Sequence, residues 1–294
     1  MLAALLAFSA LAAPAPVPSV VVARALQAAP AGGARAAAAT APLLGNPYLA
    51  SPLGEETGPD PDPRFRLDAF DCMTFVETAV ALASAETLAE ARRALDDIRY
   101  DDRPTLSGRH HEVLSQWLPA NVARGWVREI TAEVAPGLAR REEKVYTPEV
   151  WDGIRRAGRS IPGLPRARQP LGSFAVEVIA PEDVPAVAGR IPVGTLAFLL
   201  RADAPDRATR VTHVGLVVLG PGGERRVRHA TSTRGVERVI EEPLDRFLRR
   251  EQRAWPAWPV AGLALFAIPD NRAHLAEAFA GLAPAGPGGT RVSP

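Results

Sequence analysis

The apolar residues of this chain change their spacing once, and this change constrains the fold more than any other feature. Residues 72 to 132 carry apolar positions at helical spacing, whereas residues 190 to 268 read as strands joined by short loops rich in Gly and Pro. The stretch between them is rich in Pro and Arg and shows a mixed pattern. Helices followed by sequential strands predict an α+β fold, in which N-terminal helices pack on a C-terminal antiparallel sheet.

The best-defined helix is expected to begin at Cys72. Asp71 is a good N-cap residue, and apolar residues recur at helical spacing from Cys72 to Ala83. Two more helices are expected over residues 87–100 and 109–122, and Pro119 should disturb the second of these. The expected strands cover residues 193–201, 211–220, 224–232 and 262–269.

The two ends of the chain differ in composition from the rest. Residues 1–13 combine an apolar stretch with small residues and predict a secretion signal peptide, so the protein is expected to be secreted or periplasmic. Residues 14–42 are rich in Ala and Pro and predict a low-complexity linker, and residues 280–294 predict a disordered tail. One domain is therefore expected over residues 43–279.

Charge and motif content exclude several function classes. The net charge is +1 and the arginines are scattered, which argues against a nucleic-acid-binding surface. No apolar run of membrane-spanning length occurs outside the N-terminus. The chain has no HExxH motif, and its acidic "PDPDP" segment is too sparse for a calcium loop, so no metal or other cofactor is expected.

Cys72 is the only cysteine, so no internal disulfide can form. The first turn of a helix places a thiol near unpaired backbone N–H groups and the positive end of the helix dipole, which is expected to lower the pKa of the thiol. Cys72 is therefore a candidate nucleophile. Cysteine is also among the most buried residue types, and this stretch alone leaves open that Cys72 only packs in the core.

A thiol nucleophile needs an imidazole that takes and returns a proton, and a further polar group that orients the imidazole. His213 and His229 lie on two consecutive predicted strands. If residues 220–222 form a three-residue hairpin loop, Leu219 pairs with Gly223, and His213 then lies directly opposite His229 on the same face of the sheet. A loop longer by one residue, or a bulge, would put the two histidines on opposite faces. Gly215, on the same face as His213, should leave room for the cysteine-bearing helix.

Three segments together resemble a known family. "DCMTFVE", "THVGLVV" and "HATS" resemble, in order and spacing, the catalytic blocks of the NlpC-type papain-like cell-wall hydrolases. The fuller pattern is similar to the N-acetylmuramoyl-L-alanine amidase-like family, with "LLGNPYLASPL" upstream, residues 65–83 around the thiol, residues 98–131 after it, and "HATSTRGV" and "PLDRFL" late in the chain. The resemblance covers roughly residues 44 to 268.

The resemblance implies a papain-like fold and assigns roles to particular residues. It implies Cys72 as nucleophile, His213 as general base and then acid, and His229 as the orienting third member. The further candidates for oxyanion or substrate binding are Tyr48, Asp71, Glu77, Arg109 and His111. The alternatives are a packed loop aromatic for Tyr48, a buried ion pair with an arginine for Glu77, and structural hydrogen bonding for Arg109 and His111. His110 departs from the family pattern, which has Asn there.

The function implied by the resemblance is a cysteine-dependent amidase that cuts the lactyl–L-alanine amide of peptidoglycan or its muropeptide fragments through an acyl-enzyme. The chain shows no repeat or wall-anchoring module, which favours small soluble fragments as substrate. Three alternatives stay open. They are an endopeptidase of the same superfamily that cuts between D-glutamyl and diamino-acid residues, a non-catalytic muropeptide-binding module, and a structural protein with a buried thiol.

Overall fold

The computed structural model describes residues 19–278, so the expected signal peptide and C-terminal tail lie outside the described residues. The helices are α1 (Ser19–Ala28), α2 (Gly33–Thr40), α3 (Cys72–Ser84), α4 (Leu88–Arg99), α5 (Leu118–Ala123), α6 (Thr131–Val134), α7 (Pro148–Arg156), α8 (Val184–Val187), α9 (Leu244–Ala254) and α10 (Arg272–Ala278). The strands are β1 (Arg128–Glu129), β2 (Ala139–Tyr146), β3 (Gly172–Ile179), β4 (Leu196–Arg201), β5 (Val211–Leu219), β6 (Arg225–Thr231), β7 (Arg238–Pro243) and β8 (Val260–Ala267). None of these helices is long and apolar enough to cross a membrane.

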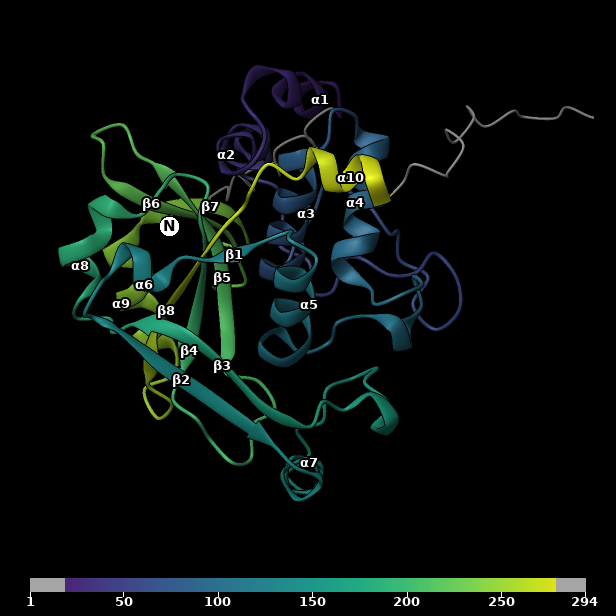
Figure 1. Ribbon diagram of the computed structural model, residues 1–294, viewed down its shortest axis with the longest axis vertical. Helices are drawn as coiled ribbons and strands as arrows, with labels where there is room; N and C mark the ends of the chain where they lie inside the picture. The colour runs from purple at the N-terminus through teal and green to yellow at the C-terminus, as the bar shows by residue number, and fades with distance from the viewer. Residues whose placement is uncertain (1–18, 279–294) are drawn as a thin grey trace, which may run out of the picture.

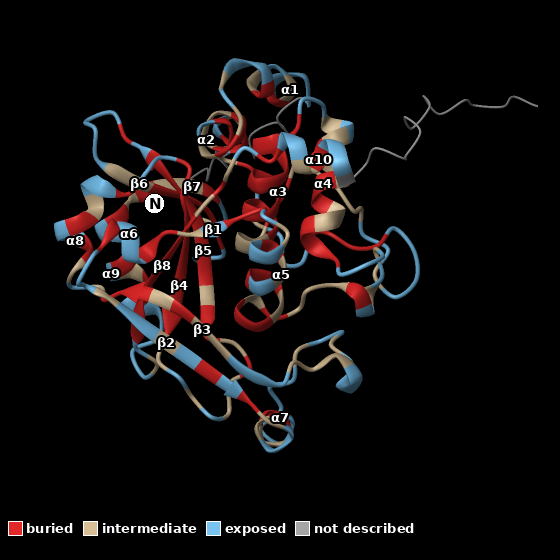
Figure 2. Cartoon of the chain, viewed as in Figure 1, coloured by how far each residue is buried: buried red, intermediate tan, exposed pale blue. Residues whose placement is uncertain are grey.

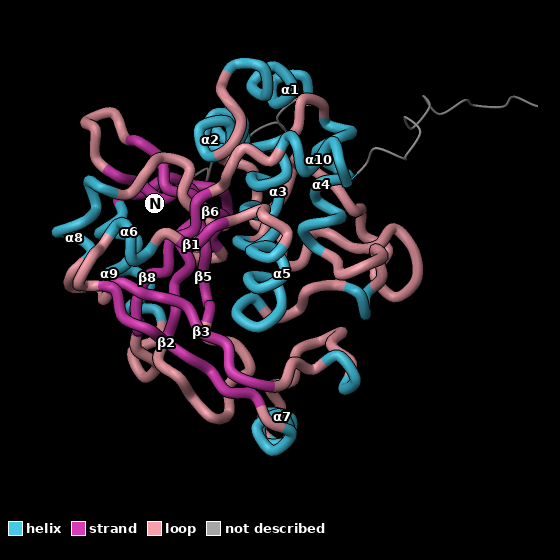
Figure 3. The backbone as a smooth tube through the Cα atoms, viewed as in Figure 1, coloured by secondary structure: helices cyan, strands magenta, loops and turns pink. Residues whose placement is uncertain are grey.

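The strands form one antiparallel sheet in the order β2-β3-β8-β4-β5-β6-β7, with β1 paired to β8. Helices α1 to α5 and α10 lie on one side of this sheet, and α6, α8 and α9 lie on the other (Figure 1). The strands stay together as a single layer between these two groups (Figure 3). The α+β class and the antiparallel sheet expected from the sequence are thereby confirmed.

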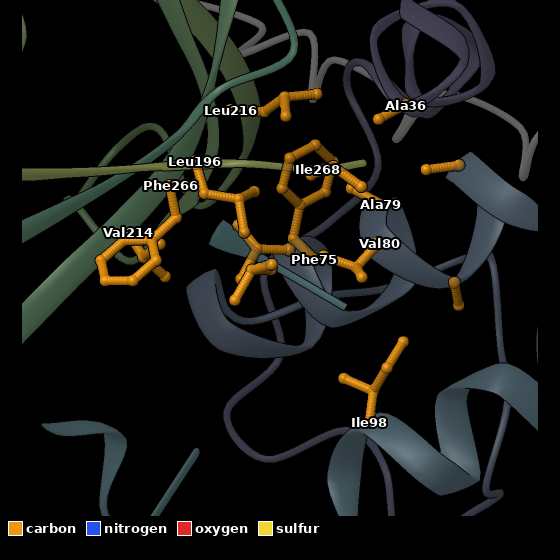
Figure 4. Packing of buried hydrophobic residues seen from close by; sticks show 14 of the residues in the cluster. Ala36, Phe75, Ala79, Val80, Ile98, Leu196, Val214, Leu216, Phe266 and Ile268 are labelled. Atoms are coloured by element: carbon orange, nitrogen blue, oxygen red, sulfur yellow. The ribbon is translucent and has the colours of Figure 1, made fainter. Parts of the chain in front are cut away.

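Each face of the sheet has its own hydrophobic core. On the first face, helix α3 contributes Phe75 and Val80, and the sheet contributes Leu196, Val214 and Phe266 (Figure 4). Alternate residues of the same strands pack on the second face against α6, α8 and α9. The central strands and α3 are buried along most of their length, whereas the edge strand β2 is largely exposed (Figure 2). Helix α3 therefore reaches the sheet through a rigid, fully packed contact.

The prediction of a low-complexity linker over residues 14–42 is wrong for the described residues 19–42, because helices α1 and α2 lie there. Val22, Leu26, Ala36 and Ala39 belong to the first core. Alanine is the strongest helix former, and its small side chain lets two helices approach closely, so an Ala-rich composition is compatible with a packed helix. The start of α2 also lies close to the loop before β4, since a Cβ on Gly194 would lie 2.0 Å from the carbonyl oxygen of Gly33.

Two further elements differ from the expectation. The helix expected over residues 109–122 starts later, as a π-helical turn over Val113–Trp117 that continues into α5. Pro119 lies just after this turn, where the helix changes from π to α. The mixed region after residue 133 holds the long β2–β3 hairpin, in which Ala139 pairs with Ile179 and Tyr146 with Gly172. Charged residues on the exposed edge hide the strand pattern of β2.

Candidate active site

Cys72 is the first residue of α3, and the local sequence explains why the helix begins there. The Asp71 carboxylate accepts hydrogen bonds from the backbone N–H of Thr74 at 2.7 Å and from its hydroxyl at 2.8 Å, and the Thr74 hydroxyl accepts the Asp71 N–H at 3.0 Å. This reciprocal capping box satisfies two backbone donors at the helix start. The backbone N–H of Ser51 also donates to the Asp71 carboxylate, at 3.1 Å. Asp71 is thus an N-cap, and its charge makes it unsuited to stabilise an oxyanion.

The surroundings of the thiol keep it protonated. Burial, the neighbouring Asp71 carboxylate and Glu251 together raise the pKa of Cys72 to about 12, because hydrogen bonds from backbone N–H groups, including that of Val214, only partly offset them. The expectation that the helix start lowers this pKa is therefore wrong, because desolvation and Asp71 outweigh the helix dipole. The Val214 contact places the thiol beside the residue that directly follows His213.

His213 and His229 contact each other. The Nε2 atom of His213 lies 2.8 Å from Nδ1 of His229, and both residues are buried. Their rings meet edge to face, with centroids 4.8 Å apart, and the ring of Phe247 on α9 lies 5.5 Å from His213 and 5.2 Å from His229. Phe247 therefore restricts the orientation of both imidazoles.

The hairpin that carries the two histidines has a different register from the one expected. Leu219 pairs with Arg225 and not with Gly223, because the connecting loop spans residues 220–224. This shift of two residues keeps both histidines on one face but makes their contact diagonal. A Cβ on Gly215 would lie 3.0 Å from the Cβ of His229, so Gly215 makes room for the neighbouring strand and not for the cysteine-bearing helix.

Glu242 and Arg250, which the sequence did not single out, extend the histidine pair. Oε1 of Glu242 on β7 lies 3.0 Å from Nε2 of His229 and accepts a hydrogen bond from Nε of Arg250 at 2.9 Å. Burial raises the pKa of Glu242, but the hydrogen bonds from His229 and Arg250 outweigh it and hold the pKa below its usual range. The available signal was the alternation of Ile240 and Glu242 on the strand after His229, just before the "PLDRFL" segment.

Both histidines are neutral at physiological pH. Burial lowers the pKa of His213 well below its usual value, and the charges of neighbouring groups, including Arg250, lower it further. Burial also lowers the pKa of His229, although Glu242 opposes the shift. The resting site thus combines a neutral thiol, two neutral imidazoles and one carboxylate.

Tyr48 lies beside the thiol. A parallel bridge pairs Tyr48 with Phe70, two residues before Cys72, and the Tyr48 N–H donates to the Glu237 carbonyl at 2.9 Å. Burial raises the pKa of Tyr48 to about 12, with smaller contributions from the charges of Cys72 and Asp71, while a hydrogen bond with the Ser232 side chain lowers it. The Tyr48 hydroxyl is therefore protonated and able to donate a hydrogen bond.

Glu77 is placed in the ion pair that the sequence left open as the alternative. Nη1 of Arg99 on α4 donates to its Oε2 at 2.6 Å, and Nε1 of Trp117 donates to its Oε1 at 3.1 Å. All three side chains are buried. Both carboxylate oxygens are thus used in joining α3 to α4 and to the π-helical turn, and Glu77 has a structural role.

Arg109 and His111 also form structural contacts. Arg109 forms ion pairs with Glu55 at 2.5 Å and Asp60 at 2.7 Å. Nε2 of His111 lies 2.7 Å from the carbonyl oxygen of Leu106. The structure therefore places Tyr48 beside Cys72, joins His213 to His229, and sets the thiol next to the backbone of Val214, the residue after His213. It places Glu77 and Arg109 in separate ion pairs. Within residues 19–278, no group of three or more His, Cys, Asp or Glu side chains is arranged to hold a metal ion.

Comparisons with solved structures agree with this fold. A Legionella pneumophila protein shares 19% identity over 85% of this chain and 89% of its own, with a TM-score of 0.65. A Bacteroides fragilis protein named as a xylanase shares 22% identity over 76% of this chain and 96% of its own, with a TM-score of 0.58. An N-acetylmuramoyl-L-alanine amidase from Bacteroides uniformis shares 20% identity over 76% of this chain and 92% of its own, with a TM-score of 0.57.

A search of curated proteins found no match. The model of the AmiA-like family, described as N-acetylmuramoyl-L-alanine amidase-like, matches residues 38–254. This range begins within α2 and includes Cys72, both site histidines, Glu242 and Arg250. The chain belongs to the N-acetylmuramoyl-L-alanine amidase-like family.

Proposed function

We propose that this chain is a cysteine amidohydrolase of the NlpC-type papain-like class that cleaves the amide between the lactyl group of N-acetylmuramic acid and L-alanine. The observation that carries the proposal is the 2.8 Å contact between His213 Nε2 and His229 Nδ1, on a strand whose next residue, Val214, bonds the Cys72 thiol through its backbone N–H. The family match supports peptidoglycan or its fragments as the substrate, and with it a site of action outside the cytoplasm.

The first half of the reaction transfers the acyl group to sulfur. Nδ1 of His213 takes the thiol proton while Sγ of Cys72 attacks the lactyl carbonyl carbon, and the carbonyl π electrons move to oxygen. The Cys72 N–H and the Tyr48 hydroxyl donate hydrogen bonds to this oxyanion. When the tetrahedral intermediate collapses, the C–N bond breaks and protonated His213 gives its proton to the leaving L-alanine amine.

The second half regenerates the enzyme. His213 takes a proton from water, the resulting hydroxide attacks the thioester carbon, and the C–S bond breaks as the lactyl carboxylic acid forms. The proton returns to the Cys72 sulfur. Because thiol and imidazole are both neutral at rest, proton transfer accompanies the attack and does not precede it.

The test is mass spectrometry of defined muropeptides incubated with the full chain, which must keep α1 and α2 because both helices belong to the core. We expect release of stem peptides that begin with L-alanine. Cys72→Ala should reduce the rate by at least about 10,000-fold. His110→Gln, which removes a histidine outside the site, should retain cleavage at neutral pH.

Other outcomes would redirect the assignment. Cuts within the stem peptide would identify an endopeptidase of the same superfamily, because the same three groups suffice for that reaction. Binding of muropeptides without cleavage by the unsubstituted chain would identify a recognition module and would refute the proposed catalysis.

A further inference from the structure

The network of side-chain hydrogen bonds that begins at His213 does not end at His229. It continues to Glu242 on β7 and to Arg250 on α9, whose Nη2 lies 2.7 Å from the same Glu242 oxygen. Arg250 is itself held, because Nη1 lies 2.8 Å from Oε1 of Glu251 and 3.2 Å from the Thr233 hydroxyl. One carboxylate oxygen is thus fixed between an imidazole and an anchored guanidinium.

The hydrogen-bonding capacity of each group determines where the protons lie. An ionised carboxylate only accepts hydrogen bonds, so Nε2 of His229 must carry the proton that faces Glu242. A neutral imidazole has one N–H, so Nδ1 of His229 is an acceptor and Nε2 of His213 must donate to it across 2.8 Å. His213 then has a bare Nδ1.

We propose that Glu242, held by Arg250, is a positioning residue that sets the tautomers of His229 and His213 and so keeps Nδ1 of His213 free to accept a proton. The assignment of the two tautomers depends on this geometry, on an ionised Glu242 and on two neutral imidazoles. Its link to catalysis rests on the proposed function, in which His213 takes the thiol proton.

A competing donor explains why the carboxylate is needed. Nη2 of Arg250 also lies 3.4 Å from Nε2 of His229. Without the carboxylate, Arg250 could donate to Nε2, and His229 would carry its proton on Nδ1. The Nε2 atom of His213 would then have to accept, and its Nδ1 would be protonated and unable to act as a base. The shorter contact, 3.0 Å to Glu242, favours the productive tautomer.

The first experiment measures the tautomers directly in the full chain at neutral pH. Ring nitrogens of ¹⁵N-labelled histidines are observed by long-range ¹H–¹⁵N NMR, with signals assigned from single histidine replacements. We expect a protonated Nε2 and a bare Nδ1 at both His213 and His229. A protonated Nδ1 at His229 would overturn the proposal, and this measurement needs no cleavage activity.

The second experiment compares Glu242→Gln with Glu241→Gln. Glu241 lies next to Glu242 in β7, but its side chain is on the other face of the sheet. There, Oε1 of Glu241 lies 2.6 Å from Nη2 of Arg228, so Glu241→Gln also removes a carboxylate–arginine pair. Glu242→Gln should lower kcat by about 100- to 10,000-fold with KM changed less than about threefold, and should shift His229 toward the Nδ1–H tautomer. Glu241→Gln should change neither kcat nor the tautomers.

The outcomes separate the two proposals. If the unsubstituted chain cleaves no muropeptide, the proposed function fails while the NMR result still decides the tautomers. If the chain cleaves muropeptides and folded Glu242→Gln cleaves them equally fast, Glu242 has no positioning role and the inference is overturned.

Discussion

Two buried polar networks end in different ways, one at helix α3 and one beside Phe247 of α9. One joins Glu77 of α3 to Arg99 and Trp117, and both oxygens of the Glu77 carboxylate accept hydrogen bonds within it. The other runs from Glu242 through His229 to His213, whose neighbour in the chain, Val214, bonds the Cys72 thiol through its backbone N–H. A network whose carboxylate oxygens are both bonded holds elements together, whereas the unprotonated Nδ1 that we propose for His213 allows the second network to exchange a proton. Burial of charge alone therefore does not identify the site.

The comparison predicts that breaking the network around Glu77 affects stability and not chemistry. Glu77→Leu leaves Arg99 buried without a counter-charge, so we expect the free energy of unfolding to fall by about 3–5 kcal/mol. Chemical denaturation measures this loss. Activity per folded molecule should stay within about threefold of the unsubstituted protein, and a far larger fall would show that Glu77 acts in the site. The double variant Glu77→Leu, Arg99→Met should recover part of the lost stability.

A second prediction concerns the loss of folding stability at acidic pH. Burial lowers the pKa of His110 to about 4, and the charge of Arg124 contributes. A histidine with a lowered pKa binds fewer protons when folded than when unfolded, so stability is present above the unfolded pKa and is lost as pH falls from about 6.5 toward 4. We expect His110 to contribute on the order of 3 kcal/mol to this loss.

Denaturation of the unsubstituted protein and of His110→Gln at pH 7 and pH 4.5 tests this prediction. The variant should lose less stability between the two pH values, although His213 and His229 will still contribute a loss of the same sign. Equal losses of stability in the two proteins would show that His110 of the folded protein is solvated or is paired with Asp101. Oδ1 of Asp101 lies 3.4 Å from Nδ1 of His110.

The smallest expected effect concerns the reactivity of the Cys72 thiol. Asp71→Asn keeps an N-cap residue but removes the charge that raises the pKa of Cys72. Alkylation of the resting thiol by iodoacetamide at pH 8 should become several times faster, by at most about tenfold. Asp68→Asn is the matched control, because Asp68 lies on the same loop but pairs with Arg66 at 2.8 Å. An unchanged rate for Asp71→Asn would mean that burial alone protects the thiol.

Local sequence patterns predict much of the candidate site. The N-cap at Asp71, the helix start at Cys72 and the two strands with His213 and His229 follow from short-range signals, and the structure has all of them. The hairpin register does not follow from such signals, because the loop over residues 220–224 is longer than the shortest one that the sequence allows. The two histidines still meet, since a shift of two residues preserves the face on which each side chain lies.

Composition is a poor guide to structure where small or charged residues pack. The alanines of α2 and the alternating charges of β2 read as linker and as irregular chain, although the first is buried and the second pairs along its whole length with β3. Tertiary packing outweighs local composition in both cases.

By itself the sequence determined the fold class, the helix start that presents the thiol, and the face shared by the two histidines, because periodicity and capping are properties of neighbouring residues. Only the tertiary structure decided the protonation of the thiol, the structural roles of Glu77 and Arg109, and the contact of Glu242 with His229. Desolvation and ion pairing depend on residues far apart in the chain, such as Glu77 and Arg99 or Glu242 and His229, and these meet only when helices and strands have packed.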